Sequence, residues 1–246
     1  EKFLLIGVRF VREEQQLSLN RNQLKYLVIV AMVIDHIAAA FLSNDSAITV
    51  IMRMIGRLTA PTMAFFIVEG YFHTKNKKKY ALRLFIFSLI SWLPYSYFEY
   101  GKATFHFSVI FTLFLGLMIV WLLDSKINSG YKIFGIVLIL FFSFLADWMI
   151  FVPLWCISFL ALERNKKAIG YGLYLATAIL YSYLVIKSSP AWTGIWAIGV
   201  FFVFPMLKLF YHGESGSKKA FHKWFFYAFY PVHLLLLLGV KCVIDL

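Results

Sequence analysis

Charged side chains are scarce in this 246-residue sequence. Asp, Glu, Lys and Arg together make up 15% of it, whereas a soluble domain carries about 25%. Apolar residues reach 61%, and apolar runs of about 17–25 residues recur along the whole length. Strands of a membrane β-barrel would instead alternate polar and apolar residues. The sequence therefore excludes a soluble globular domain and predicts an all-α integral membrane protein.

Acidic residues and cysteines are also few. There are 12 Asp and Glu against 24 Lys and Arg, which gives a net charge of +12. The basic residues are dispersed between the apolar runs, so we expect a lipid bilayer and no nucleic acid as partner. Cys156 and Cys242 lack the CxxC or Cys/His spacing of a metal site, so no metal is predicted.

The apolar runs predict a bundle of about nine transmembrane helices, with ten as the alternative count. The connecting loops are short and show no strong internal repeat, so residues 1–246 are interpreted as a single transmembrane domain. Residues 1–18 are too short to span and are expected to form an amphipathic or disordered lead. The predicted spans are residues 24–42, 49–72, 80–98, 104–123, 131–146, 148–162, 168–186, 191–210 and 224–242.

The distribution of Lys and Arg predicts the orientation. With the N-terminus inside, 19 of the 24 basic residues fall in cytoplasmic segments and 3 fall outside. The remaining two, Arg53 and Arg57, lie within the second span. Because basic residues concentrate in cytoplasmic loops, this bias favours an N-in, C-out chain.

Several ionisable residues fall inside the predicted spans, where each costs at least ~2.5–3.5 kcal/mol at a helix centre. They are Asp35, His36, Arg53, Arg57, Glu69 and His233. At ~1.5 Å per residue, four of them lie together ~10–14 Å below the outer surface, namely Asp35, His36, Arg57 and His233. Such a coincidence of costly groups predicts a buried polar site.

Helix geometry separates the roles of the two adjacent residues Asp35 and His36. They differ by ~100° around the helix axis, so they do not face each other. We expect Asp35 to pair with Arg57 on the second span instead. Lys25 and His36 are eleven positions apart, which places them within ~20° of one face and ~16 Å apart along the axis. That distance is similar to the length of an extended pantetheine arm, with a phosphate held at Lys25 and the chemistry at His36.

Structural interpretations stay open for single residues. Arg53 is near the outer interface and can snorkel to it. His233 can be a hydrogen-bonded packing residue. For Asp35 and His36 together a purely structural role is less favoured, because both coincide in depth with Arg57.

Four motifs occur in order along the chain: M-x-x-D-H at 32–36, I-G-R-x-x-x-P at 55–61, E-G-Y-x-x-T at 69–74 and F-Y-P-x-H-L at 229–234. In this combination the chain resembles the TraX family of membrane proteins over most of residues 19–242. The resemblance implies a multi-pass acetyltransferase of the bacterial inner membrane that uses cytosolic acetyl-CoA. Its implied acceptor is extracytoplasmic or membrane-embedded, either a pilin-like N-terminal amine or a glycan hydroxyl.

The resemblance also implies roles for matched residues. Related transmembrane acyltransferases place ten residues between a basic residue and a first-span His, as Lys25 and His36 are placed here, but their paired arginines are spaced differently from Arg53 and Arg57. His36 is then the expected general base, with Asp35 as the second catalytic residue. Residues expected to contact acetyl-CoA are Lys25, Arg57, Glu69, Tyr71, Thr74 and Arg83, with phosphates also near Lys75–Lys79. Residues expected along the substrate path are Arg53, Tyr230 and His233.

Two other functions stay open at this stage. A proton-coupled transporter also uses intramembrane Asp, His and Arg, although neither an inverted repeat nor paired broken helices are evident. A non-catalytic assembly factor for fimbriae or pili would not need Asp35 and His36 for chemistry.

Overall fold

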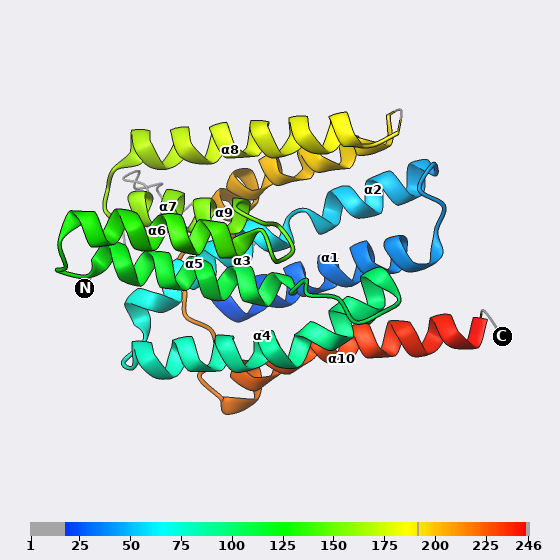
Figure 1. Cartoon of the computed structure of the whole chain (residues 1–246), viewed down its shortest axis with the longest axis horizontal. Helices are drawn as coiled ribbons and strands as arrows, with labels where there is room; N and C mark the ends of the chain where they lie inside the picture. Colours follow the sequence, from blue (N-terminus) through cyan, green and yellow to red (C-terminus); the bar gives the residue numbers. More distant parts are fainter. Residues whose placement is uncertain (1–17, 191, 245–246) are drawn as a thin grey trace.

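The computed structural model describes residues 18–190 and 192–244, and every regular element in these ranges is a helix (Figure 1). The all-α prediction is thus confirmed there, while the lead predicted for residues 1–18 lies outside them except for its last residue. The elements are α1 (Arg21–Phe41), α2 (Ala47–Gly56), α3 (Thr59–His73), α4 (Lys77–Tyr100), α5 (Val109–Asp124), α6 (Ser129–Ser143), α7 (Phe151–Glu163), α8 (Lys167–Ser188), the 3-10 helix η1 (Thr193–Phe202), α9 (Val203–Phe210) and α10 (Ala220–Ile244).

Each predicted span coincides with a helical segment. In the part of the chain that the structure describes, six segments are long and apolar enough to cross a bilayer, with α2 and α3 together forming one and η1 and α9 another. The helices α5, α6 and α7 are apolar but have only 16, 15 and 13 residues. At ~1.5 Å per residue they are ~20–24 Å long, shorter than the ~30 Å hydrocarbon core. The chain is therefore a multi-pass helical membrane protein; nine crossings and the N-in orientation stay predictions.

The ends of the helices follow local sequence signals. Asn20 caps α1, because its side chain accepts hydrogen bonds from the N–H groups of Asn22 and Gln23, and the Gln23 side chain accepts from the Asn20 N–H in return. This capping box satisfies backbone donors that a helix start leaves free. Helix α4 ends at Tyr100 and is followed by Gly101, whose φ of 67° is a left-handed conformation that glycine adopts without strain.

The helices form a closed ring of packed neighbours. In order around the ring they are α1, α2, η1, α8, α7, α5, α4 and α10, which returns to α1. Helix α3 packs against α1, α5 and α7, and α6 packs outside on α5. Figure 1 shows these helices running along the long axis of the molecule. The ring encloses the polar residues that the sequence places at membrane depth.

The second span is broken between α2 and α3, at Arg57 and Leu58. Pro61 explains the position of the break, because proline has no N–H for the carbonyl four residues earlier, which belongs to Arg57. The break falls one turn before the proline, at the residue whose carbonyl loses its hydrogen bond. As a consequence, Arg57 sits at a helix end in the interior of the bundle.

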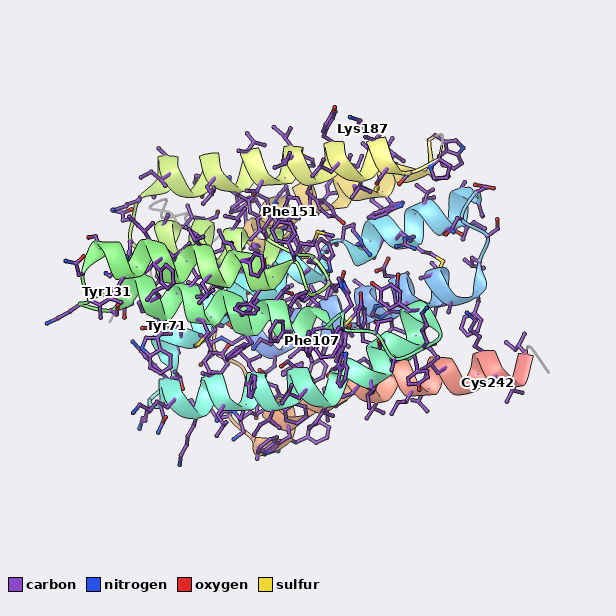
Figure 2. All side chains as sticks on the ribbon, in the orientation of Figure 1. Tyr71, Phe107, Tyr131, Phe151, Lys187 and Cys242 are labelled. Carbon is purple, nitrogen blue, oxygen red and sulfur yellow. The ribbon has the colours of Figure 1, made fainter. Side chains whose placement is uncertain are left out.

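Two loops close part of the bundle at half its length. Phe107, two residues before α5, and Phe151, the first residue of α7, both lie near the middle of the long axis (Figure 2). The N–H of Phe107 donates to the carbonyl of Leu145 at 2.7 Å, which joins loop 101–108 to loop 144–150. The short helices therefore end in the middle of the molecule, beside the polar interior.

Candidate functional site

A cavity of about 470 Å³ runs through the ring of helices. One end is basic, and its cationic or potentially cationic lining residues are Arg21, Lys25, His73, Arg83, Lys218, Lys219, His222 and Lys223. The middle is mainly apolar, lined among others by Ile29, Met32, Ala60, Met63, Ile67, Leu84, Leu113 and Phe226. The other end is polar again, with Asp35, His36, Arg53, Arg57, Glu99, Asp147 and Trp148. The cavity thus connects a cationic mouth to the ionisable residues at membrane depth.

Lys25 and His36 both line this cavity, as their shared helix face predicts. Lys25 lies at the basic mouth, where its Nζ is 4.9 Å from the ring centroid of Phe66 and 5.4 Å from that of Phe226. His36 lies at the polar end and is partly accessible from the cavity. The two residues therefore lie at opposite ends of one cavity.

The expected pair of Asp35 and Arg57 is present and buried. The Arg57 Nη2 donates to Asp35 Oδ2, and each residue is 8% exposed. The Arg57 Nη1 also donates to the hydroxyl of Tyr181 at 3.2 Å. Its guanidinium carbon lies 4.7 Å and 4.6 Å from the ring centroids of Trp148 and Trp196. Arg57 is thus held by a carboxylate, a hydroxyl and two aromatic faces.

Arg53 is held less completely than Arg57. Its guanidinium carbon lies 4.8 Å from the centroid of Trp196, and its Nε is 3.9 Å from Asp35 Oδ1, beyond hydrogen-bond distance. Both Arg53 Nε and Asp35 Oδ1 are buried without a hydrogen-bond partner. The polar end of the cavity therefore has unused donor and acceptor capacity, which a bound group can satisfy.

Two glycines allow the helices of this site to approach one another. A Cβ on Gly56 would lie 2.2 Å from the Cβ of Asp35, so α2 can meet α1 at this level only without a side chain. A Cβ on Gly199 would lie 2.2 Å from the carbonyl oxygen of Met54, so η1 can likewise approach α2 this closely only because position 199 has no side chain. The close approach places Trp196 of η1 over both arginines.

We predict that Gly56→Ala destabilises the protein by about 1–3 kcal/mol, because the new methyl group forces α1 away from α2 and disturbs the Asp35–Arg57 pair. The measurement is unfolding of the purified protein in detergent. The matched control is Gly172→Ala on α8, where an added Cβ meets no atom within 4 Å. Equal stability of the two variants would contradict the steric role of Gly56.

His36 and His233 are in direct contact. The His36 Nδ1 and His233 Nε2 are 2.8 Å apart, and the two rings are stacked with centroids 5.0 Å apart. The His233 Nδ1 lies 3.0 Å from the carbonyl oxygen of Phe229, one turn earlier on α10. His233 is 5% exposed and lies behind His36, whereas Tyr230 from the same helix lines the cavity.

Glu69 supports the basic mouth from behind, and neither Glu69 nor Tyr71 lines the cavity. Glu69 accepts from Arg21 Nε at 2.9 Å and from the hydroxyl of Tyr211. Burial raises the pKa of Tyr211, so this hydroxyl stays protonated and donates. Tyr71 donates to Asp124 at 2.7 Å. Among the residues expected to contact acetyl-CoA, the lining ones are Lys25, Arg57, Thr74 and Arg83.

A segment that we name the strap, residues 211–219, crosses the start of α1. The Arg21 N–H donates to the carbonyl of Glu214 at 2.9 Å, and the Asn22 side chain donates to the carbonyl of Ser217 at 2.8 Å. A Cβ on Gly216 would lie 2.4 Å from Asn22 Cγ, so the strap fits closely there. Its last residues line the cavity mouth, namely Ser217, Lys218 and Lys219.

Comparison with known proteins decides the family. The model of the family described as TraX protein matches residues 20–241. The chain belongs to the TraX family. This TraX-family chain is also similar to a protein of Dichelobacter nodosus named "Probable fimbrial assembly protein FimC, serogroup H1". The two are 34% identical over an alignment of 244 residues, and the match covers 91% of this chain and 96% of the relative. No solved structure matches.

Sequence reasoning missed several residues that the TraX-family fold brings to the site. Asp147 was not among the predicted site residues, but the half-depth loop 144–150 carries it to the cavity. Trp148, Trp196 and Tyr181 hold Arg57 from three segments distant in sequence. Lys77, in the Lys75–Lys79 run, forms a salt bridge with Asp124 at 3.2 Å. No residue of this run lines the cavity. Besides Lys25, the mouth is lined by Lys223 of α10 and by Lys218 and Lys219 of the strap. The signal for the strap lysines was a Gly/Ser-rich loop that ends in two lysines before a span.

Proposed function

We propose that this protein is an acetyl-CoA-dependent acetyltransferase of the bacterial inner membrane. The observation that carries the proposal is the cavity that joins a basic mouth, through an apolar middle, to His36. Acetyl-CoA has the same order of chemistry, with phosphates at one end, a pantetheine arm and a thioester at the other end. A small-molecule site of this kind is concave, mostly apolar and carries a few placed polar groups.

The basic mouth supports binding of the phosphates. It combines Arg21 and Lys25 of α1, Arg83 of α4 and the strap lysines Lys218 and Lys219. The start of α10 follows the strap directly, and the N-terminus of a helix favours anions. Glu69 compensates part of the charge of Arg21, which leaves the other cations for the ligand. With the predicted N-in orientation this mouth faces the cytosol, where acetyl-CoA is available.

His36 is the general base of the proposed reaction. It takes a proton from the acceptor amine or hydroxyl, and the acceptor nitrogen or oxygen attacks the thioester carbonyl carbon. The carbon–sulfur bond then breaks, and the CoA thiolate leaves with the proton returned from His36. Arg53 and Arg57 at the same end of the cavity stabilise the negative charge that develops on the carbonyl oxygen.

The acceptor reaches the site from the end opposite the basic mouth. Glu99 lines the cavity and is exposed, and the loops before α5 and α7 end at half the length of the molecule. Such a short outer wall lets an extracytoplasmic or membrane-embedded acceptor approach His36. The acceptor is a pilin-like N-terminal amine or a glycan hydroxyl.

A second candidate is a non-catalytic role in fimbrial assembly. The observation that favours it is the name of the relative from Dichelobacter nodosus, a probable fimbrial assembly protein. In that case the polar interior only holds the fold, and variants of His36 still support fimbriae. The acetyltransferase proposal predicts instead that variants of His36 lose any fimbrial function that depends on acetylation.

The first test is binding of labelled acetyl-CoA to purified protein in lipid nanodiscs. We predict that Lys25→Gln raises the Kd about tenfold, because it removes a charge-assisted contact of about 1.5 kcal/mol at the mouth. The matched control is Lys187→Gln on α8, an exposed lysine at the outer surface of the bundle (Figure 2). This control should leave the Kd unchanged.

Two results would count against the proposal. No acetyl-CoA binding, and no release of CoA with amine, peptide or glycan acceptors, would overturn the acetyltransferase function. An unchanged Kd in Lys25→Gln would remove Lys25 from the phosphate site and leave that role to the strap.

A further inference from the structure

We infer that His233 is a positioning residue that keeps His36 in one tautomer, with a proton on Nδ1 and the lone pair of Nε2 free for the acceptor. This inference rests on the proposed function for its catalytic consequence. The structural part rests on the contacts among Phe229, His233 and His36 alone.

The first step is the contact between His233 and Phe229. A backbone carbonyl oxygen only accepts hydrogen bonds, so the His233 Nδ1 that lies 3.0 Å from it carries a proton and donates. Phe229 is four residues earlier on α10, so the helix itself sets this distance. The Phe229 ring also stacks on His233, with centroids 5.2 Å apart and planes 7° apart. The orientation of the His233 ring is therefore fixed by its own helix.

The second step is the contact between the two histidines. A neutral imidazole with a proton on Nδ1 has a lone pair on Nε2. The His233 Nε2 thus accepts, and the His36 Nδ1 at 2.8 Å donates to it. Neutrality of the pair is favoured by its surroundings, because a further buried positive charge would lie in the same interior as Arg53 and Arg57. Asp35 is engaged by Arg57 and not by the histidines.

The third step follows for His36. With its proton on Nδ1, the remaining nitrogen Nε2 is unprotonated. His36 lines the cavity, whereas His233 lies behind His36. The nitrogen that can accept a proton from a molecule in the cavity is therefore Nε2 of His36. When Nε2 takes the proton of the acceptor amine or hydroxyl, the Nδ1–H bond to His233 holds the imidazolium in place. His233 touches neither substrate in this arrangement.

The test combines protein NMR with kinetics. In protein labelled with 15N at histidine, we expect His36 to be protonated on Nδ1 and not on Nε2. In His233→Leu we expect the proton of His36 to be shared between Nδ1 and Nε2. A spectrum of the unmodified protein with the His36 proton on Nε2 would overturn the inference, whether or not the protein transfers acetyl groups. The signals are assigned by comparison with His36→Gln.

The kinetic arm separates positioning from a merely structural role. We expect His233→Leu to lower kcat about 10- to 100-fold, part of the 10²–10⁴ that a general base contributes, with the Kd for acetyl-CoA changed less than twofold. His233→Gln should restore most of kcat, because its amide can donate to Phe229 and accept from His36. Leu235→Ala, at an exposed position of α10, is the control.

The outcomes of the two arms are distinguishable. Absence of acetyl transfer in the unmodified protein contradicts the proposed function, and the NMR arm still decides the tautomer of His36. Transfer with equal kcat in His233→Leu and His233→Gln contradicts the positioning role. If His233→Leu does not fold, the spectrum of the unmodified protein and kcat of His233→Gln remain decisive.

Discussion

His36→Ala is expected to lower the turnover of acetyl-CoA by about 10²–10⁴-fold while the Kd for acetyl-CoA stays within twofold. The reason is the position of His36 at the far end of the cavity from the basic mouth. In the proposed reaction, removal of the imidazole takes away the base that accepts the proton, and general-base catalysis accounts for a factor of this size. The proposal assigns binding of acetyl-CoA mainly to the mouth and the apolar middle, which the substitution leaves in place. Single-turnover measurements with labelled acetyl-CoA in nanodiscs separate the two quantities.

The matched control is His212→Ala, an exposed histidine of the strap that does not line the cavity. It should keep both turnover and binding. Full turnover in His36→Ala would remove His36 from the chemistry. A strain that carries His36→Ala and still assembles normal fimbriae would favour the assembly role over acetyl transfer.

The helical segments could be predicted from the sequence with little error, because long apolar runs leave few alternatives in a bilayer. The predicted first span, residues 24–42, is α1 with bounds Arg21–Phe41. The same physics predicts the break in the second span, since Pro61 cannot satisfy the carbonyl of Arg57. The shortness of α6 and α7 was also visible, because their predicted spans, residues 131–146 and 148–162, are the shortest of the nine. The span predicted at 104–123 was longer than α5, which has 16 residues. That two loops meet at half depth was not visible, because the contact between Phe107 and Leu145 is tertiary.

The pair of Asp35 and Arg57 could be predicted because charges of opposite sign at one depth must compensate each other. The helix phase of Lys25 and His36 was predictable for a similar reason, since one helix fixes both directions. The partners that complete the site follow from helix packing instead. Trp196 reaches Arg57 because Gly199 lets η1 lie close to α2, and Trp148 reaches it from loop 144–150. One sequence alone does not reveal that neighbourhood.

Glu69 shows how a family motif can mark a supporting residue rather than one that lines the site. The E-G-Y-x-x-T motif suggested contact with acetyl-CoA, yet Glu69 binds Arg21 and Tyr211. This contact joins α3 to the starts of α1 and of the strap, so it shapes the basic mouth from behind. Thr74 of the same motif does line the cavity. The motif therefore combines one residue that supports the mouth with one that faces it.

Asp35→Ala is expected to destabilise the protein by about 3–5 kcal/mol, the typical effect of removing one partner of a buried ion pair. Asp35 and Arg57 are each 8% exposed, so water cannot replace the lost carboxylate. The hydroxyl of Tyr181 and the two tryptophan rings around Arg57 do not neutralise its charge. The measurement is the free energy of unfolding in detergent, and Asp45→Ala in the exposed loop after α1 is the control, with an expected change within about 0.5 kcal/mol.

A double-mutant cycle then shows whether the loss comes from the unpaired charge. If it does, Asp35→Ala combined with Arg57→Leu is more stable than the sum of the two single variants predicts, by about 1–3 kcal/mol, because the second substitution removes the charge that the first one left unpaired. Additive effects would mean that Asp35 and Arg57 stabilise the fold through separate contacts. The double variant should nevertheless lack acetyl transfer, since Arg57 belongs to the polar end of the cavity where the carbonyl oxygen is expected. Restored stability without restored turnover would therefore separate the contribution of the pair to the fold from its contribution to the reaction.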